Sequence, residues 1–147
     1  MHWFCDTPSL QQIDPAWPRL PNTAIALLPK GKTDFELQGA EQVLAQQMND
    51  NRLADFAAGR ACAHLAQKQL GLSAQPILRD ERAPVWPKGQ CGSISHAKDW
   101  ALAAVSTSLR GIGVDVETQG RVKQKLYRAL FRPEEVNAFS SCPDAAP

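Results

Sequence analysis

Residues 92–117 read GSISHAKDWALAAVSTSLRGIGVDVE, and this stretch decides the fold. It contains short apolar segments separated by turn-like residues, at 92–95, 100–106 and 112–117. Segments of this length, with small and polar residues between them, predict three adjacent β-strands. The last segment alternates apolar and acidic residues, and side chains two apart on a strand point the same way. Asp115 and Glu117 should therefore share one face of the strand.

A helical region precedes these segments. Residues 39–70 are rich in Ala, Gln, Leu and Arg, which are strong helix formers, and Gly71 supplies a stop signal. We expect two helices with a break near residues 49–51. On the second helix, residues spaced by three and four share one face: Leu53, Phe56, Ala57, Arg60, Ala61, His64 and Leu65. Arg60 lies inside this largely apolar stripe.

The remaining segments are shorter. Residues 23–28 form an apolar run before Pro29, which predicts a buried strand, and the proline-rich residues 76–89 predict a loop with room for an edge strand. Residues 121–131 and 133–139 each have a helical pattern. Together these elements predict an α+β fold in which a short antiparallel sheet packs with helices.

The two ends of the chain have a different composition. Residues 1–22 contain several prolines with aromatic residues between them, which favours an extended N-terminal arm. Residues 140–147 are small, polar and proline-bearing, which favours a disordered tail.

The overall composition excludes several classes of function. The 147 residues have room for one ordinary domain, and 16 basic against 15 acidic residues give a net charge of +1, unlike a nucleic-acid-binding protein. No apolar run approaches the roughly 18 to 20 residues of a membrane-spanning helix, and no signal peptide is evident. The cysteines lack a C-x-x-C pair, which argues against a zinc site and a disulfide framework. We therefore expect reduced thiols and a cytoplasmic protein.

Asp115 and Glu117 are candidate metal ligands. Magnesium favours one or two protein carboxylates together with waters and substrate phosphates, so a metal-bound pyrophosphate is the natural ligand of such a pair. Gly111 and Gly113 would let that ligand approach the backbone closely. The alternative is that two alternating acids merely solvate the outer face of a half-buried strand.

Several other residues are candidate phosphate ligands. Ser95 and His96 lie at the end of a predicted strand, where a hydroxyl and an imidazole can donate to phosphate oxygens. Arg60 is a guanidinium among apolar residues, which calls for a phosphate or carboxylate partner. The loop preceding Ser95 adds further basic residues: Arg79, Arg82 and Lys88. A surface histidine, a structural salt bridge and solvated loop charges are the corresponding alternatives.

These motifs together resemble a known enzyme family. Arg60, then RAPVWP at residues 82–87, GSISH at 92–96 and GIGVDVE at 111–117 are similar, in this order, to the motifs of the 4'-phosphopantetheinyl transferases. Within that superfamily the chain most resembles the larger, surfactin-synthetase-activating type, in the enterobactin synthetase component D branch. The resemblance covers roughly residues 50–139.

The resemblance implies an activity and a set of roles. Such enzymes move phosphopantetheine from coenzyme A to a serine of an acyl or peptidyl carrier protein, and siderophore synthesis of the enterobactin kind is one destination. Asp115 and Glu117 match the Mg²⁺ ligands and Glu135 matches a further catalytic acid. Residues that match those holding coenzyme A are Arg60, Arg82, Ser95 and His96.

The resemblance also implies a domain plan. Residues 23–110 correspond to the N-terminal α+β half-domain of the transferase fold, and residues 111–139 to the start of its second half. The family pattern continues with a Trp-x-x-Lys-Glu segment, which these 147 residues do not contain. We therefore expect a truncated second half and self-association through the surface that the missing half would cover.

Two other functions remain as alternatives. Because the Lys-Glu segment would supply a third metal carboxylate and a lysine, the chain without it could be a non-catalytic remnant that binds coenzyme A or a carrier protein. A serine hydrolase would have to use Ser93 or Ser95 with His96 and Asp115, but GSISH is not the G-x-S-x-G elbow and adjacent side chains on a strand point apart.

Overall fold

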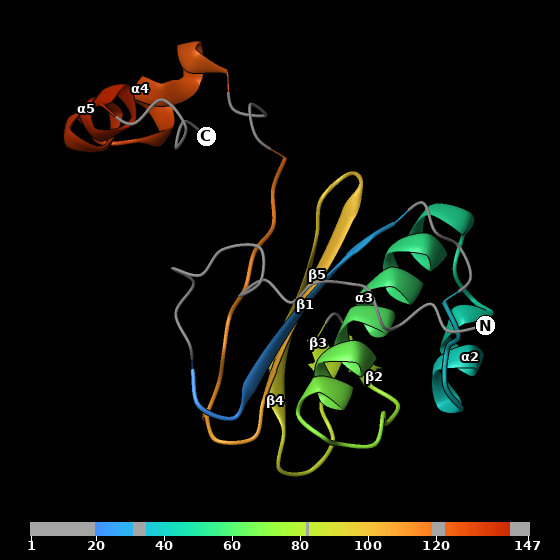
Figure 1. Ribbon diagram of the computed structural model, residues 1–147. Coiled ribbons are helices and arrows are strands. Elements are labelled where there is room, and N and C mark those ends of the chain that lie inside the picture. Colours follow the sequence, from blue (N-terminus) through green and yellow to red (C-terminus); the bar gives the residue numbers. More distant parts are fainter. Residues whose placement is uncertain (1–19, 31–34, 82, 119–122, 142–147) are drawn as a thin grey trace. The chain divides into compact units, whose positions relative to one another are not determined.

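The computed structural model describes residues 20–30, 35–81, 83–118 and 123–141 (Figure 1). The chain divides into two compact units, residues 1–116 and 117–147. The first unit combines an antiparallel sheet with packed helices, so the predicted α+β class is confirmed.

The main sheet of the first unit has three strands. They are β1 (Thr23–Pro29), β4 (Cys91–His96) and β5 (Trp100–Ser106). Their order is β1-β5-β4 and both pairs are antiparallel, with β5 in the centre (Figure 1). Residues 101–106 of β5 are all buried, whereas burial along β1 alternates from residue to residue. The strands predicted at residues 23–28, 92–95 and 100–106 are confirmed.

The fourth predicted strand, at residues 112–117, is wrong. Residues 111–118 have no regular secondary structure, although the segment reaches β4 through a side chain: the Val116 N–H donates to the Ser95 hydroxyl, 3.2 Å away. Two glycines contribute no side chains to pack and weaken a strand interior, and here the contact with β4 is made by Ser95 in place of a backbone ladder.

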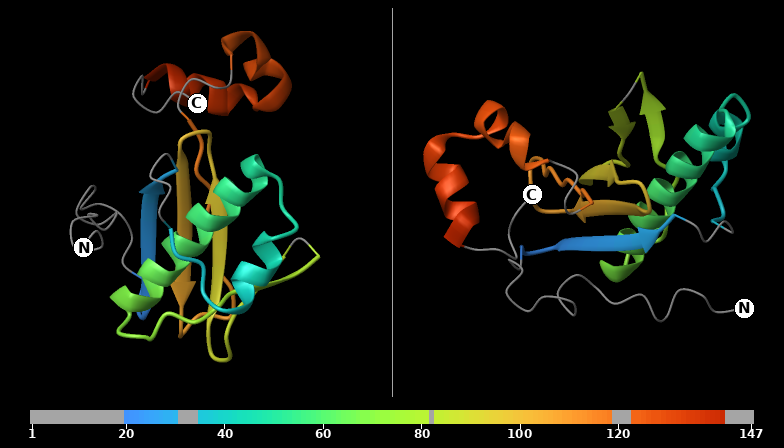
Figure 2. Two further views of the ribbon diagram at one scale, coloured as in Figure 1. Left: turned by 90° about the vertical axis from the view of Figure 1, so that its right-hand side faces the viewer. Right: turned by 90° about the horizontal axis from the view of Figure 1, so that it is seen from above.

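Two helices follow β1, as predicted. They are α2 (Ala40–Ala45) and α3 (Asp50–Gln69), and the break between them ends at Asn49, whose side chain accepts from the Arg52 N–H at 3.0 Å. After α3 the chain turns at Gly71, which has a φ of +74°. Helix α3 lies diagonally across one face of the sheet, and α2 lies on the side of α3 away from the sheet (Figures 1 and 2).

The predicted apolar stripe on α3 is too narrow. Every residue from Ala58 to Gln67 is buried, so this part of the helix is enclosed all round. The sheet covers one side, and polar contacts cover the other: Gln67 accepts from the Gln75 N–H at 2.9 Å and donates to Gln90 at 2.9 Å. A polar residue can occupy the enclosed side because a partner satisfies its hydrogen bonds.

Small residues allow α3 to approach the sheet closely. Most of the buried core residues of α3, β1 and β5 are alanines. A Cβ atom at Gly59 of α3 would lie 2.7 Å from Cγ2 of Ile94 and 2.6 Å from Nε2 of His96. Gly59 therefore sets the distance between α3 and strand β4, where these two side chains begin.

A separate two-stranded sheet follows α3. It consists of β2 (Leu78–Asp80) and β3 (Ala83–Val85), which pair antiparallel. The sequence predicted a loop with room for one edge strand here, and the structure has a short hairpin.

The second unit contains a 3-10 turn and two helices. They are η1 (Gln124–Leu126), α4 (Tyr127–Leu130) and α5 (Pro133–Ser141). The predicted helix at 121–131 is shorter than expected, with residues 121 and 122 outside the described residues, whereas α5 begins at Pro133 as predicted and runs on to residue 141. Most of the N-terminal arm and residues 142–147 of the tail also lie outside the described residues.

The described helices share one further property. None of them combines the length and the apolar character needed to cross a membrane.

We expect Gly92→Ala to lower the free energy of unfolding by about 1–3 kcal/mol, because overpacking forces neighbours to shift. An added Cβ would lie 2.5 Å from both the Ala104 carbonyl oxygen and Cζ2 of Trp86. Urea unfolding followed by tryptophan fluorescence measures the loss. Gly111→Ala is the control, because nothing lies within 4 Å of its Cβ position. Equal unfolding midpoints for the two variants would contradict this account.

Candidate functional site

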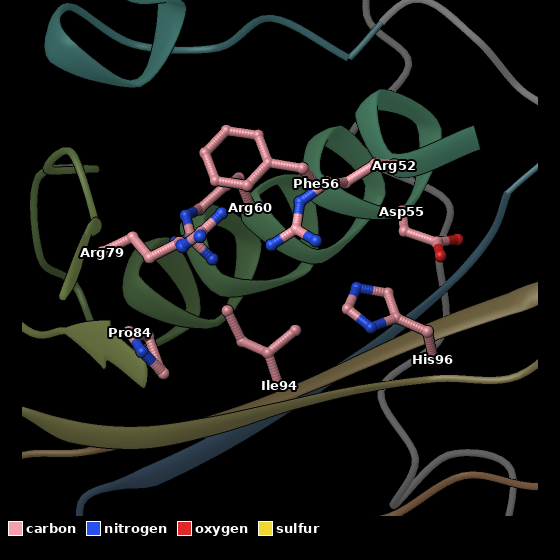
Figure 3. A pocket seen from close by; sticks show the side chains of 8 residues that line it. All are labelled: Arg52, Asp55, Phe56, Arg60, Arg79, Pro84, Ile94 and His96. Carbon is pink, nitrogen blue, oxygen red and sulfur yellow. The ribbon is translucent and has the colours of Figure 1, made fainter. Parts of the chain in front are cut away.

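A cavity of about 270 Å³ lies in the first unit between α3, the β2–β3 hairpin and β4 (Figure 3). Its lining residues come from these elements: Arg52, Asp55, Phe56, Arg60, Arg79, Pro84, Ile94 and His96. Three arginines and a histidine thus face one acidic residue. This charge balance favours an anion in the cavity, although the whole chain carries a net charge of only +1.

Helical spacing explains the contribution of α3 to the cavity. Arg52, Phe56 and Arg60 are separated by four residues each, so they lie on one face of the helix. The figure shows the side chains of Arg52 and Arg60 turned towards a common space with that of Arg79 (Figure 3). Arg60 and Arg79 were predicted from the sequence as phosphate ligands, and the structure brings them together.

Arg60 is held in place by several contacts. It is buried, its Nε donates to the Ile77 carbonyl at 2.7 Å, and its Nη2 donates to the Leu78 carbonyl at 3.1 Å. Its Nε lies 3.8 Å from the Glu41 carboxylate, and the guanidinium carbon is 4.4 Å from the centre of the Phe56 ring. The structural salt bridge that was the alternative for Arg60 exists, and the same residue also lines the cavity.

The charge of Arg60 is in an unfavourable setting that an anion would improve. Burial lowers the pKa of Arg60, the carboxylate of Glu41 opposes this, and the neighbouring Arg79 lowers the pKa further. A phosphate between the two guanidinium groups would relieve their repulsion and could accept hydrogen bonds in the fork geometry that arginine offers.

His96 joins the cavity from the end of β4. Burial against α3 lowers the pKa of His96, the Asp55 carboxylate and a hydrogen bond with the Asp55 backbone raise it, and Lys30 and Arg60 lower it again, with a net lowering. Lys30 pairs with Asp55 at 2.5 Å and donates to the Ala97 carbonyl at 2.7 Å. A bound phosphate would favour the protonated imidazole.

Ser95 points away from this cavity. Ile94 and His96 line the cavity, and alternation along β4 sends the side chain between them to the opposite face. There the Ser95 hydroxyl donates to Oδ1 of Asp115 at 2.5 Å, and Oδ1 also accepts from the Val116 N–H at 3.0 Å. The structure therefore groups Ser95 with Asp115, and groups His96 with Arg60. A Ser-His pair for a hydrolase is not formed by these two residues.

Two other predicted site residues, Glu117 and Glu135, belong to the second unit. Oε1 of Glu117 accepts from the Thr118 N–H at 2.8 Å. Oε2 of Glu135 accepts from the Arg132 N–H at 2.8 Å, as a residue at the third position of a helix does in a capping box. Arg82 lies outside the described residues.

The donor chemistry of Asp115 and Glu117 suits magnesium. Both offer hard carboxylate oxygens, which Mg²⁺ favours when waters and substrate phosphates complete its shell. Within the described residues, no group of three or more His, Cys, Asp or Glu could hold a metal ion by itself. A site of this kind would need ligands from the substrate.

The described cysteines are not candidates for a nucleophile in this cavity. Burial raises the pKa of Cys62 to about 12, and its Sγ donates to the Ala101 carbonyl at 3.1 Å inside the core. Cys91 is partly buried, and its Sγ donates to the Leu109 carbonyl at 3.3 Å. Both are free thiols in the described part of the chain.

Sequence reasoning missed Arg52, Asp55 and Glu41. The spacing of eight residues between Arg52 and Arg60 could have identified Arg52, since positions four and eight apart on a helix share a face. Lys88, which was considered as a phosphate ligand, is not among the lining residues.

We expect the wild-type free energy of unfolding to fall as the pH is lowered from about 7.5 to about 5.5, and the fall to be smaller in His96→Gln. The folded-state pKa of His96 lies below its ordinary value of 6.5, so the unfolded chain takes up a proton first as the pH falls. The stabilisation by neutral His96 is complete above pH 6.5 and is lost towards the lower folded-state pKa. Urea unfolding at both pH values measures the difference, and an identical fall in the variant would refute the assignment.

Comparison with known proteins identifies the region that carries the cavity. Residues 40–106 match the model of the 4'-phosphopantetheinyl transferase N-terminal domain. This range contains α2, α3, the hairpin, β4 and β5, and hence every residue that lines the cavity.

Curated relatives agree with this match. The chain is 33% identical over 105 residues to 4'-phosphopantetheinyl transferase Npt of Nocardia iowensis, covering 69% of this chain and 47% of that protein. It is 44% identical over 66 residues to enterobactin synthase component D of Salmonella typhi, covering 45% and 27%. It is 31% identical over 97 residues to enterobactin synthase component D of Escherichia coli K12, covering 66% and 47%.

The chain spans about half or less of the length of these curated relatives. The matched part is the N-terminal part of the family pattern, with the cavity inside it. The chain therefore carries the N-terminal domain of the 4'-phosphopantetheinyl transferase superfamily, in the branch that includes enterobactin synthase component D.

Proposed function

We propose that this protein acts as a 4'-phosphopantetheinyl transferase, which moves phosphopantetheine from coenzyme A to a serine of an acyl or peptidyl carrier protein. The observation that carries the proposal is the cavity, where Arg52, Arg60, Arg79 and His96 converge inside the region that matches the transferase N-terminal domain. Coenzyme A carries a 3'-phosphate and a pyrophosphate, and such groups need several convergent cations.

The reaction itself asks little covalent chemistry of the protein. The carrier serine attacks the phosphorus that bears the pantetheine arm, and adenosine 3',5'-bisphosphate leaves. The arginines would hold and orient the nucleotide end, so the phosphorus meets the serine in a fixed position. Their charges would also stabilise the negative charge that develops on the leaving group.

Magnesium is part of the proposal, with Asp115 and Glu117 as its ligands and Glu135 as a further acid of the site. Bound there, Mg²⁺ would neutralise charge on the pyrophosphate. The Ser95 hydroxyl, which donates to Asp115, would orient that carboxylate towards the metal. Ser95 would then position a metal ligand, and we propose Arg82 as a further ligand of coenzyme A.

The similarity to enterobactin synthase component D supports siderophore or other nonribosomal peptide synthesis as the pathway. We propose the cytoplasm as the compartment, because coenzyme A and the carrier would both be available there and the described cysteines are free thiols.

The predicted domain plan also stays a proposal. Residues 23–110 would be the N-terminal half-domain, and residues 111–139 the start of the second. Self-association would use apolar side chains of the second unit, where Leu126 and Leu130 are exposed.

A binding protein without transfer activity is the second candidate. It is favoured by the cavity itself, because convergent cations can hold the phosphates of coenzyme A without any transfer chemistry. Such a protein would hold coenzyme A through the arginine cavity and a carrier through its surface, and would not form the holo-carrier.

The wild-type chain should convert an apo-carrier domain to its holo form with coenzyme A and Mg²⁺, as followed by intact-mass spectrometry. Asp115→Asn should slow this conversion by about 100-fold, since losing a metal carboxylate removes several kcal/mol of charge stabilisation. Glu134→Gln, which alters an exposed acid of α5, should convert at nearly the wild-type rate.

The same experiment separates the candidate functions. Coenzyme A binding without conversion would select the binding protein. A folded wild-type chain that neither binds coenzyme A nor converts the carrier would contradict both.

A further inference from the structure

The Glu41 side chain on α2 is completely buried, with 0% of its surface exposed, and it lies outside the set of residues that line the cavity. Its Oε1 accepts from the Ile77 N–H at 2.7 Å and is 3.0 Å from Nε2 of His64. Its Oε2 accepts from the Gln38 N–H at 2.9 Å. A buried carboxylate is costly unless it is paired and hydrogen-bonded, and here both oxygens have partners.

Glu41 and Arg60 bind the two backbone polar groups of the same residue, Ile77. Glu41 accepts from the N–H of Ile77, while Nε of Arg60 donates to the carbonyl of the same residue at 2.7 Å and Nη2 donates to the carbonyl of Leu78 at 3.1 Å. Ile77 is fully buried and directly precedes β2. The start of the hairpin is therefore fixed on both sides by charged groups.

This arrangement links two walls of the cavity. Arg60 belongs to α3, and the next residue of the hairpin after Leu78 is Arg79, whose side chain also lines the cavity. The carboxylate lies 3.8 Å from Nε of Arg60, which orients the guanidinium towards the hairpin carbonyls. Displacing Glu41 would release both Arg60 and the strand that carries Arg79.

We propose that Glu41 is a positioning residue for the anion cavity: it fixes Arg60 and the base of the β2–β3 hairpin so that Arg60 and Arg79 meet the same phosphate group. This inference rests on the proposed function, because Glu41 would position the arginines that hold the coenzyme A phosphates. Glu41 itself does not touch the ligand.

The carboxylate is ionised when it performs this role. Burial raises the pKa of Glu41, but the hydrogen bonds from His64, Ile77 and Gln38 and the charge of His64 outweigh burial and lower the pKa. A neutral amide in its place would present an NH₂ group to a region crowded with donors. Glu41→Gln should therefore disturb Arg60 while nearly keeping side-chain volume.

The test is calorimetric titration of adenosine 3',5'-bisphosphate into the full chain and its variants. We expect Glu41→Gln to bind roughly tenfold more weakly than the wild type, within the range of couplings measured between contacting residues. Glu36→Gln, an exposed acid before α2, is the matched control and should bind within about twofold of the wild type.

A double-variant cycle separates positioning from a general structural role. Because Glu41 acts in part through Arg60, Glu41→Gln should weaken binding by a clearly smaller factor in the Arg60→Gln background than in the wild-type background. A merely structural Glu41 would weaken binding by the same factor in both backgrounds, which would overturn the inference. A folded Glu41→Gln variant that binds adenosine 3',5'-bisphosphate with wild-type affinity would also overturn the inference.

Glu41→Asp decides the question if Glu41→Gln does not fold. It keeps the charge but shortens the side chain, so we expect a folded protein whose affinity is several-fold lower, and an unchanged affinity would overturn the inference. A folded wild-type chain that binds no adenosine 3',5'-bisphosphate would instead refute the proposed function, and the role of Glu41 with it.

Discussion

The pairing of the buried Arg60 guanidinium with its backbone and carboxylate partners is the interaction on which the rest of the structure depends. A charge in the protein interior is tolerated only when it is paired and its donors are used, and Arg60 meets this condition with the Ile77 and Leu78 carbonyls, the Glu41 carboxylate and the Phe56 ring. These partners come from α2, α3 and the start of β2. One side chain thus connects these three elements, with its guanidinium beside the space that an anion would fill.

Close packing of α3 on the sheet provides the second constraint. Alanines on both sides of the interface and Gly59 at its edge let the helix approach β4 closely enough for Ile94 and His96 to lie against it. A larger residue at position 59 would move the helix or these side chains. The geometry of the cavity is therefore set by small residues as much as by the charged ones that line it.

Sequence reasoning predicted the elements whose local signals agree with their packing. The strands β1, β4 and β5 were found because apolar runs and turn residues indicated them, and the break before α3 lies near residues 49–51, as expected. The strand at residues 112–117 was wrong, because an alternating pattern does not reveal whether a neighbouring strand offers a backbone ladder. The stripe on α3 was too narrow, since the sequence does not reveal that α2 and the chain after α3 cover its far side.

The sequence identified several residues of the candidate site, but it did not show which of them lie together. Arg60 and His96 do share a cavity, while the neighbouring Ser95 turns to the other face of β4 and meets Asp115, as the alternation of side chains along a strand requires. Glu41 was missed because it acts through three-dimensional proximity to Arg60, whereas the helical spacing between Arg52 and Arg60 could have identified Arg52. The most direct test of the central claim is calorimetric titration of coenzyme A into the wild-type chain, Arg52→Ala and the exposed control Arg110→Ala. The account predicts saturable binding that falls by at least about tenfold in Arg52→Ala and stays nearly unchanged in Arg110→Ala; equal affinities in all three proteins would contradict it.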